Sequence, residues 1–175
     1  MPRGSSRVVV DTSALISLAF GGLLEPVLEE FEVLVPDVVI EELKMIAAHE
    51  DETALVAKEV LKNRANLKVE HIEEEDYKPL LTSRMDAGEA ACVVLAREAD
   101  VEALIADDFR AMHQLVVYSE AYGFALGPCT VLVQALVLKG RISREDASNA
   151  FERIARKRNW LGRPIYRYAK KMLGL

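Results

Sequence analysis

The sequence predicts an α/β fold, a three-layer α/β/α sandwich with a central parallel sheet of about 4–5 strands. Short β-rich runs alternate with longer helical patterns along the chain, which is typical of βαβ units. The runs "VVV" and "ALIA" are apolar on both faces, as strands covered by helices on both sides must be. Because no repeat and no Gly/Ser/Pro-rich linker interrupts the pattern, we expect a single domain over 1–175.

Each expected strand is a short apolar run bounded by polar or turn residues. The runs are VVV (8–10), EVLVP (32–36), NLKVEHI (66–72), VEALIADD (101–108) and GFALG (123–127). The expected helices lie between and after them, at 12–19, 21–31 after an initial turn, 37–48, 52–63, 85–99, 109–122, 128–139, 143–158 and 163–173. The polar segment EEEDYKPLLTSR (73–84) is expected to form a loop.

Composition limits the class of protein. Of the 175 residues 51% are apolar and 29% charged, which is typical of a soluble globular chain. No apolar run approaches the roughly 18–20 residues of a membrane span, and "MPRGSSR" lacks the apolar core of a secretory signal. We therefore expect a cytoplasmic protein without membrane contact. Cys92 and Cys129 have no CxxC spacing and are expected to be free and buried. The three histidines are scattered, so a zinc site has little support.

Charge is distributed unevenly along the chain. Residues 1–138 carry 11 basic and 25 acidic residues, a net charge of −14, whereas 139–175 carry 11 basic and 3 acidic, a net of +8. The basic helical part at about 139–175 either offers a surface to an anionic partner or docks on the acidic body. Both interpretations stay open at this point.

Carboxylates follow strands or open helices at four points along the chain. They are Asp11 after the first strand, Glu41 and Glu42 early in the helix after the second, Asp86 and Glu89 opening the helix at 85–99, and Asp107 with Asp108 after the strand at 101–108. Taken singly, each is better explained as a helix cap, or in the case of Glu41 and Glu42 as a solvated helix face. The carboxyl ends of parallel strands share one edge of a sheet, so the group predicts an acidic site there.

Such a site needs a counter-charge. Two carboxylates about 4 Å apart at an effective dielectric of about 20 repel by roughly 4 kcal/mol, which a divalent cation would relieve. Oxygen ligands without neighbouring histidine or cysteine favour Mg²⁺ or Mn²⁺. The chemistry indicated is metal-assisted phosphodiester hydrolysis, with Thr12 and Ser13 hydrogen-bonding a ligand or phosphate.

Other acid-rich α/β sites fit less well. A haloacid-dehalogenase-like phosphatase needs an Asp where this chain has Ser13, and a response-regulator receiver needs paired acids where Asp11 stands alone. The sequence has no G-x-x-x-x-G-K-[ST], which excludes a P-loop nucleotide enzyme.

Four motifs in order, "VVVDTSALI", "VPDVVIEEL", "DAGEAACVVLA" and "LIADD", resemble the PIN domain, a nuclease fold that includes VapC-type toxins of toxin–antitoxin pairs. They cover about residues 7–109, and "NWLGRPIYRYAKKML" resembles the closing helix of a poorly characterised prokaryotic PIN branch. The resemblance implies an acidic Mg²⁺ or Mn²⁺ site. The resemblance implies four acidic ligands in this sequence. The first is Asp11, and the second is Glu42 in preference to Glu41. The third is Glu89, with Asp86 as a neighbour or substitute, and the fourth is Asp108, with Asp107 as a possible stand-in. Ala106 replaces the Thr of the family's T-x-D motif.

Two hypotheses follow. The first is a metal-dependent ribonuclease, which the resemblance extends to a toxin with an antitoxin partner and to a homodimer. In it the basic residues Arg153, Arg156, Lys157 and Arg158 attract RNA. Trp160 is expected in the core rather than stacking on a base. The second is a catalytically weak or inactive PIN-like module that binds RNA or protein, favoured by Ala106 and by the net acidity.

Overall fold

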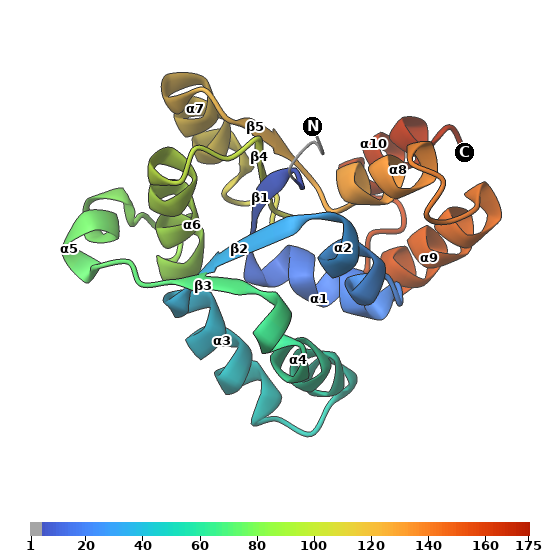
Figure 1. Cartoon of the computed structure of the whole chain (residues 1–175), viewed down its shortest axis with the longest axis horizontal. Coiled ribbons are helices and arrows are strands. Elements are labelled where there is room, and N and C mark those ends of the chain that lie inside the picture. Colours follow the sequence, from blue (N-terminus) through green and yellow to red (C-terminus); the bar gives the residue numbers. More distant parts are fainter. Residues whose placement is uncertain (1–4) are drawn as a thin grey trace.

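The computed structural model describes residues 5–175 and places a five-stranded parallel sheet at the centre of the protein (Figure 1). The strands are β1 (Arg7–Val10), β2 (Glu32–Pro36), β3 (Lys68–Glu70), β4 (Ala103–Ile105) and β5 (Ala125–Gly127), in the order β3-β2-β1-β4-β5. The register pairs Val9 with Leu34 on one side and with Leu104 on the other. All three are buried, which confirms the expectation that central strands are apolar on both faces.

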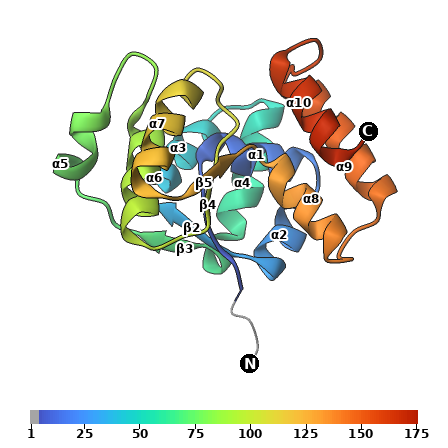
Figure 2. The same cartoon turned by 90° about the horizontal axis from the view of Figure 1, so that it is seen from above.

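Within residues 5–175, ten α-helices connect and follow the strands. They are α1 (Thr12–Phe20), α2 (Leu24–Glu30), α3 (Asp37–Ala47), α4 (Glu52–Lys62), α5 (Glu74–Tyr77), α6 (Ala87–Glu98), α7 (Met112–Tyr122), α8 (Thr130–Leu138), α9 (Arg144–Lys157) and α10 (Pro164–Leu173), with 3₁₀ turns η1 (Arg64–Asn66) and η2 (Lys78–Leu80). Figures 1 and 2 both show α5, α6 and α7 on one side of the sheet and α8, α9 and α10 on the other. The α/β sandwich with a parallel sheet is thereby confirmed.

The strand order places a crevice at the centre of the sheet. From β1 the chain moves outward to β2 and β3, then returns to pair β4 against the other side of β1. Ligands of open α/β sheets bind at such a reversal, outside the carboxyl ends of the strands. Asp11 follows β1 and Asp107 and Asp108 follow β4, so both sides of the crevice end in carboxylates.

Two segments differ from the sequence expectation. The expected loop at 73–84 contains α5 and η2, where acidic residues at 74–76 favour the first turn of a helix and Pro79 fits early in the 3₁₀ turn. The helix expected from Phe109 begins only at Met112, because the Asp108 side chain accepts the Arg110 amide (2.8 Å) and forms a local turn. Such side-chain bonds compete with helix formation.

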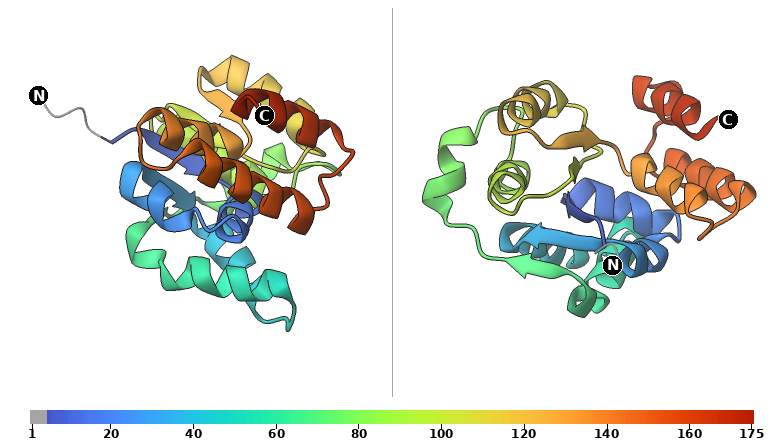
Figure 3. Two further views of the ribbon diagram at one scale, coloured as in Figure 1. Left: turned by 90° about the vertical axis from the view of Figure 1, so that its right-hand side faces the viewer. Right: turned by 45° about the horizontal axis from the view of Figure 1, so that its top comes forward.

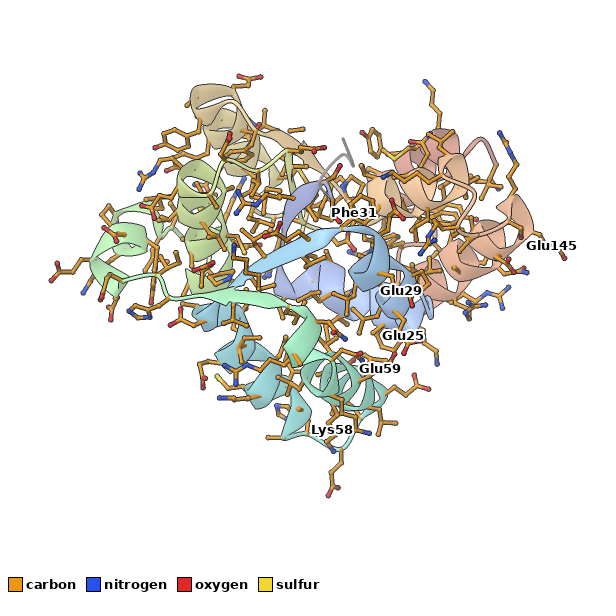
Figure 4. The ribbon with its side chains drawn as sticks, viewed as in Figure 1. Glu25, Glu29, Phe31, Lys58, Glu59 and Glu145 are labelled. Carbon is orange, nitrogen blue, oxygen red and sulfur yellow. The ribbon has the colours of Figure 1, made fainter. Side chains whose placement is uncertain are left out.

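The basic part at 139–175 packs against the acidic body through several ion pairs. Lys139 Nζ lies 2.6 Å from Glu30 Oε1, and Arg141 contacts both Glu29 and Glu30 of α2; Glu29 is labelled in Figure 4. The left view of Figure 3 shows α9 and α10 lying side by side. Docking on the body therefore accounts for part of the charge asymmetry.

Three expectations about single residues are also met. Cys92, Cys129 and Trp160 are buried, and both cysteines are free. Within residues 5–175 no single helix is long and apolar enough to cross a membrane; only α1 and α2 together, bent by 118°, reach that length and composition.

Candidate active site

Carboxylates from four segments line one pocket of about 400 Å³ at the carboxyl ends of β1 and β4. The acidic side chains are Asp11, Glu42, Asp86, Glu89 and Asp108, joined by Thr12, Ser13 and Arg158. The structure thus brings five of the six expected metal ligands together. Glu41 does not line the pocket; it is exposed and pairs with Lys44, which supports Glu42 as the second acid.

Asp11 is held at the end of β1 by three hydrogen bonds. Its Oδ1 accepts the Ala14 amide (2.8 Å), which caps α1, and the Ser13 hydroxyl donates to both carboxylate oxygens (2.8 Å each). Ser13 Oγ also accepts the amide of Asp107 (3.0 Å). Ser13 therefore ties the acid after β1 to the backbone after β4, the supporting position expected from sequence.

Glu42 enters the site from α3 and touches two other helices. Its Oε2 accepts the hydroxyl of Thr12 at the start of α1, and its Oε1 accepts the amide of Gly88 (3.1 Å) at the start of α6. A β-carbon at position 88 would overlap the Glu42 carboxylate, with the Cδ atom only 2.6 Å away. A larger residue at position 88 would therefore displace the Glu42 carboxylate from this position.

Asp86 and Glu89 form a capping box at the start of α6. Asp86 Oδ1 accepts the Glu89 amide (2.9 Å), and Glu89 Oε2 accepts the Asp86 amide (3.0 Å). The cap interpretation and the site interpretation both hold here, since one oxygen of each carboxylate makes the cap while both residues line the pocket.

The two aspartates after β4 diverge. Asp108 lines the acidic pocket, and its carboxylate accepts a fork of bonds from the Arg110 guanidinium, the shortest 2.6 Å. Asp107 turns away from this pocket and is buried; its Oδ1 accepts the Cys129 amide (2.7 Å). Its Oδ2 finds no partner within the described chain. Asp107, the expected stand-in, is thus the one predicted ligand that does not line the acidic pocket.

The buried acids resist ionisation. Burial raises the pKa of Asp11 well above its ordinary value, and the nearby charges of Asp107 and Glu89 add to the rise. Burial, with the charges of Asp86 and Asp108, raises the pKa of Glu89 to about 7. Asp108 differs, because Arg110 outweighs burial and lowers its pKa. Carboxyl groups whose pKa values are raised by burial and by one another mark a candidate functional site.

The donor set fits a hard divalent cation. Carboxylate oxygens are the main possible metal ligands that line the pocket, from Asp11, Glu42, Glu89 and Asp108, and such oxygen ligands are the kind that Mg²⁺ and Mn²⁺ prefer. Within residues 5–175 no three acidic, histidine or cysteine side chains stand close enough to hold an ion as they are, so their rotamers would have to converge around it.

The expected RNA-binding residues separate into two groups. Arg153 donates to the Gly21 carbonyl (2.7 Å) and Lys157 pairs with Glu52 (2.7 Å), so both fasten α9 to the body. Arg156 is exposed, and Arg158 lines the acidic pocket. Of the four, only Arg158 therefore lies where it could contact an anionic ligand in the acidic pocket.

Sequence reasoning missed several residues of the site. Gly88 was visible in "GEA", but its role depends on a contact 46 residues away in sequence. Arg110 follows Asp108 by two residues, a spacing at which the pair could have been suspected. His49 and Thr53 line the mouth of the pocket, and no signal in the sequence marks them.

Comparison with known proteins agrees with the fold and with this arrangement. A family model described as "DUF3368: PIN domain" matches residues 7–174, which extends the expected resemblance through the C-terminal helices. No curated protein matches the chain. PIN domains are generally nucleases and typically use divalent metals. The parallel sheet, the acids at its switch point and the family match lead to one conclusion: the chain belongs to the PIN-domain family.

Proposed function

We propose that the protein is a Mg²⁺- or Mn²⁺-dependent endoribonuclease that hydrolyses phosphodiester bonds of RNA in the acidic pocket. The observation that carries this proposal is the convergence of five carboxylates from four segments at the switch point of the sheet. Family membership supports a nuclease, and the predominance of carboxylate oxygens among the possible ligands supports a metal-dependent one.

In this proposal Asp11, Glu42, Glu89 and Asp108 hold the metal, which would polarise the phosphate and lower the pKa of the attacking water. Ser13 and Thr12 fix the orientations of Asp11 and Glu42 through their hydroxyl bonds. Asp86 keeps Glu89 in place through the capping box. Rigid placement of this kind is what a metal site requires of its surroundings.

The test is cleavage of single-stranded RNA with Mg²⁺ or Mn²⁺, using Asp11→Asn and EDTA as the inactive conditions. Asp51→Asn is a matched control, because Asp51 caps α4 with the same bond (2.8 Å to the Ala54 amide) but lies outside the pocket. Asn caps a helix about as well as Asp, so both variants should fold. We expect Asp11→Asn to lose cleavage and Asp51→Asn to keep it. Equal activity in wild type and Asp11→Asn would leave a PIN-like binding module without catalysis.

We further propose that RNA cleavage serves a cytoplasmic toxin held by an antitoxin protein, a role supported by the resemblance to VapC-type toxins and by family membership. Induced expression should then arrest growth, and Asp11→Asn should not. A small antitoxin-like gene beside this one should encode a protein that co-purifies with the chain. Light scattering of the purified chain tests the homodimer implied by the family.

A further inference from the structure

A second pocket of about 360 Å³ adjoins the acidic one. Asp108 and Arg158 line both pockets, so the two are continuous across these side chains. The second pocket is otherwise formed by the segment after β4, including Asp107 and Arg110, and by the connection from α9 to α10, including Arg163.

Positive charge predominates in this second pocket. Three guanidinium groups, from Arg110, Arg158 and Arg163, face two carboxylates, Asp107 and Asp108. Asp108 is already bonded to Arg110. The amino end of α10, which begins at Pro164, also borders the pocket and adds the partial positive charge of a helix N-terminus.

Two of these arginines are available to a ligand. Arg158 forms no ion pair or side-chain hydrogen bond with any residue of 5–175; its Nε is buried, and its charge lies near Asp107 and Asp108. Arg163 is exposed and forms no ion pair with any residue of 5–175. A guanidinium that no protein side chain pairs with can donate through its terminal nitrogens to an anionic oxygen. Arginine forks match phosphate oxygens in geometry as well as charge.

We propose that this second pocket binds a backbone phosphate of single-stranded RNA, beside the phosphate that enters the acidic pocket. The assignment rests on the proposed function, since it treats the two pockets as neighbouring subsites on one strand. Arg158 and Arg163 bind the phosphate, and Arg110 remains on Asp108. The pocket thereby fixes which phosphodiester bond of a bound strand lies over the carboxylates.

The experiment is calorimetric titration in EDTA, with inorganic phosphate as one probe and a short single-stranded RNA as the other. Arg158→Gln and Arg163→Gln should each lower the affinity for both probes about tenfold, which corresponds to the loss of roughly one charge-assisted hydrogen bond. Arg156→Gln is the matched control: it removes the same charge two residues from Arg158, is exposed, and lines neither pocket. The affinity of Arg156→Gln for phosphate and for RNA should stay within about twofold of the wild-type affinity.

Several results would overturn the proposal. The first is that wild type binds no phosphate, and the second is that Arg156→Gln loses as much affinity as Arg158→Gln and Arg163→Gln. The third is that Arg158→Gln and Arg163→Gln weaken phosphate binding but leave RNA binding unchanged, which would indicate a site for free phosphate. Should Arg158→Gln unfold, the exposed Arg163→Gln decides alone. Because EDTA prevents metal-dependent cleavage, failure of the nuclease proposal appears only in the cleavage assay, whereas failure of this one appears in the titration.

Discussion

Asp11 shows how one carboxylate can serve the fold and the site together. Its cap bond to Ala14 and its two bonds from Ser13 offset the cost of burying it, although burial still keeps its pKa high. The sequence allowed either a cap or a ligand, and at residue scale these roles are compatible. The same holds for Asp86 and Glu89 in their capping box.

The raised pKa of Glu89 predicts a pH dependence of stability. Its pKa of about 7 exceeds the ordinary 4.5, so the folded protein binds this proton more tightly than the unfolded chain does. The stabilisation is therefore complete below about pH 4.5 and is lost as the pH rises through about 7. In EDTA, the free energy of unfolding of wild type should fall by about 1–3 kcal/mol more than that of Glu89→Gln between about pH 5 and pH 8.

Urea unfolding at the two pH values measures this difference. Gln keeps the shape of Glu and can still accept the Asp86 amide, so the cap survives the substitution. Glu59→Gln, an exposed substitution on α4 (Figure 4), should behave as wild type. If the free energy of unfolding falls more steeply with pH in Glu89→Gln than in wild type, the raised pKa of Glu89 is contradicted.

Gly88→Ala should destabilise the protein by about 1 kcal/mol, because the Glu42 carboxylate must move and give up its hydrogen bond from the amide of position 88. The new methyl group would overlap the Glu42 carboxylate. In a Glu42→Ala background the same substitution should cost much less, because the overlapping group is absent and alanine is the better helix former. Urea unfolding of the four proteins completes the cycle, and equal costs in both backgrounds would show that the contact is unimportant.

At the scale of elements, α9 illustrates how a basic helix can be structural. Arg153 bonds the carbonyl of Gly21 beyond the end of α1, and its removal leaves that carbonyl without this partner. Lys157 forms an exposed ion pair with Glu52. We expect Arg153→Ala to cost about 1–2 kcal/mol and Lys157→Ala within about 0.5 kcal/mol, both read from urea unfolding. If Lys157→Ala costs more than Arg153→Ala, the contact that holds α9 on the body is the ion pair at the C-terminal end of the helix.

The elements themselves were largely predictable. Apolar runs gave the five strands, and helical spacing gave the helices around them, because burial on both faces leaves a continuous pattern. What the sequence could not predict depends on local side-chain bonds. Asp108 delays α7 by bonding Arg110, and the charged segment at 73–84 forms a short helix that no apolar pattern marks.

At the scale of the whole molecule, the acidic site should couple metal to stability. With free Mg²⁺ or Mn²⁺ at about 100 times its dissociation constant, the gain is about 2.7 kcal/mol, or roughly 5–10 °C in Tm. Asp11→Asn should lose most of this shift in Tm, whereas Asp51→Asn should keep it, because Asp11 lines the acidic pocket and Asp51 does not. Thermal unfolding with and without EDTA checks this, and equal shifts in the two variants would exclude the acidic pocket as the metal site.

The candidate site was predictable as a set of acids but not as a shape. Strand ends and motif order indicated Asp11, Glu42, Glu89 and Asp108, all of which line one pocket. The choice between Asp107 and Asp108 depended on which way each side chain turns after β4, and that is decided by the Cys129 amide and by Arg110. Long-range contacts of this kind leave no local pattern.

The contact between Glu42 and Gly88 also constrains how this chain can vary over time. One carboxylate joins α3, α1 and α6 through Thr12 and the Gly88 amide, and it fits only where position 88 has no side chain. Positions 42 and 88 should therefore change together among descendants of this gene. A lineage that replaces Gly88 would have to move or shorten the side chain at 42, and with it alter one of the acids on which the proposed chemistry depends.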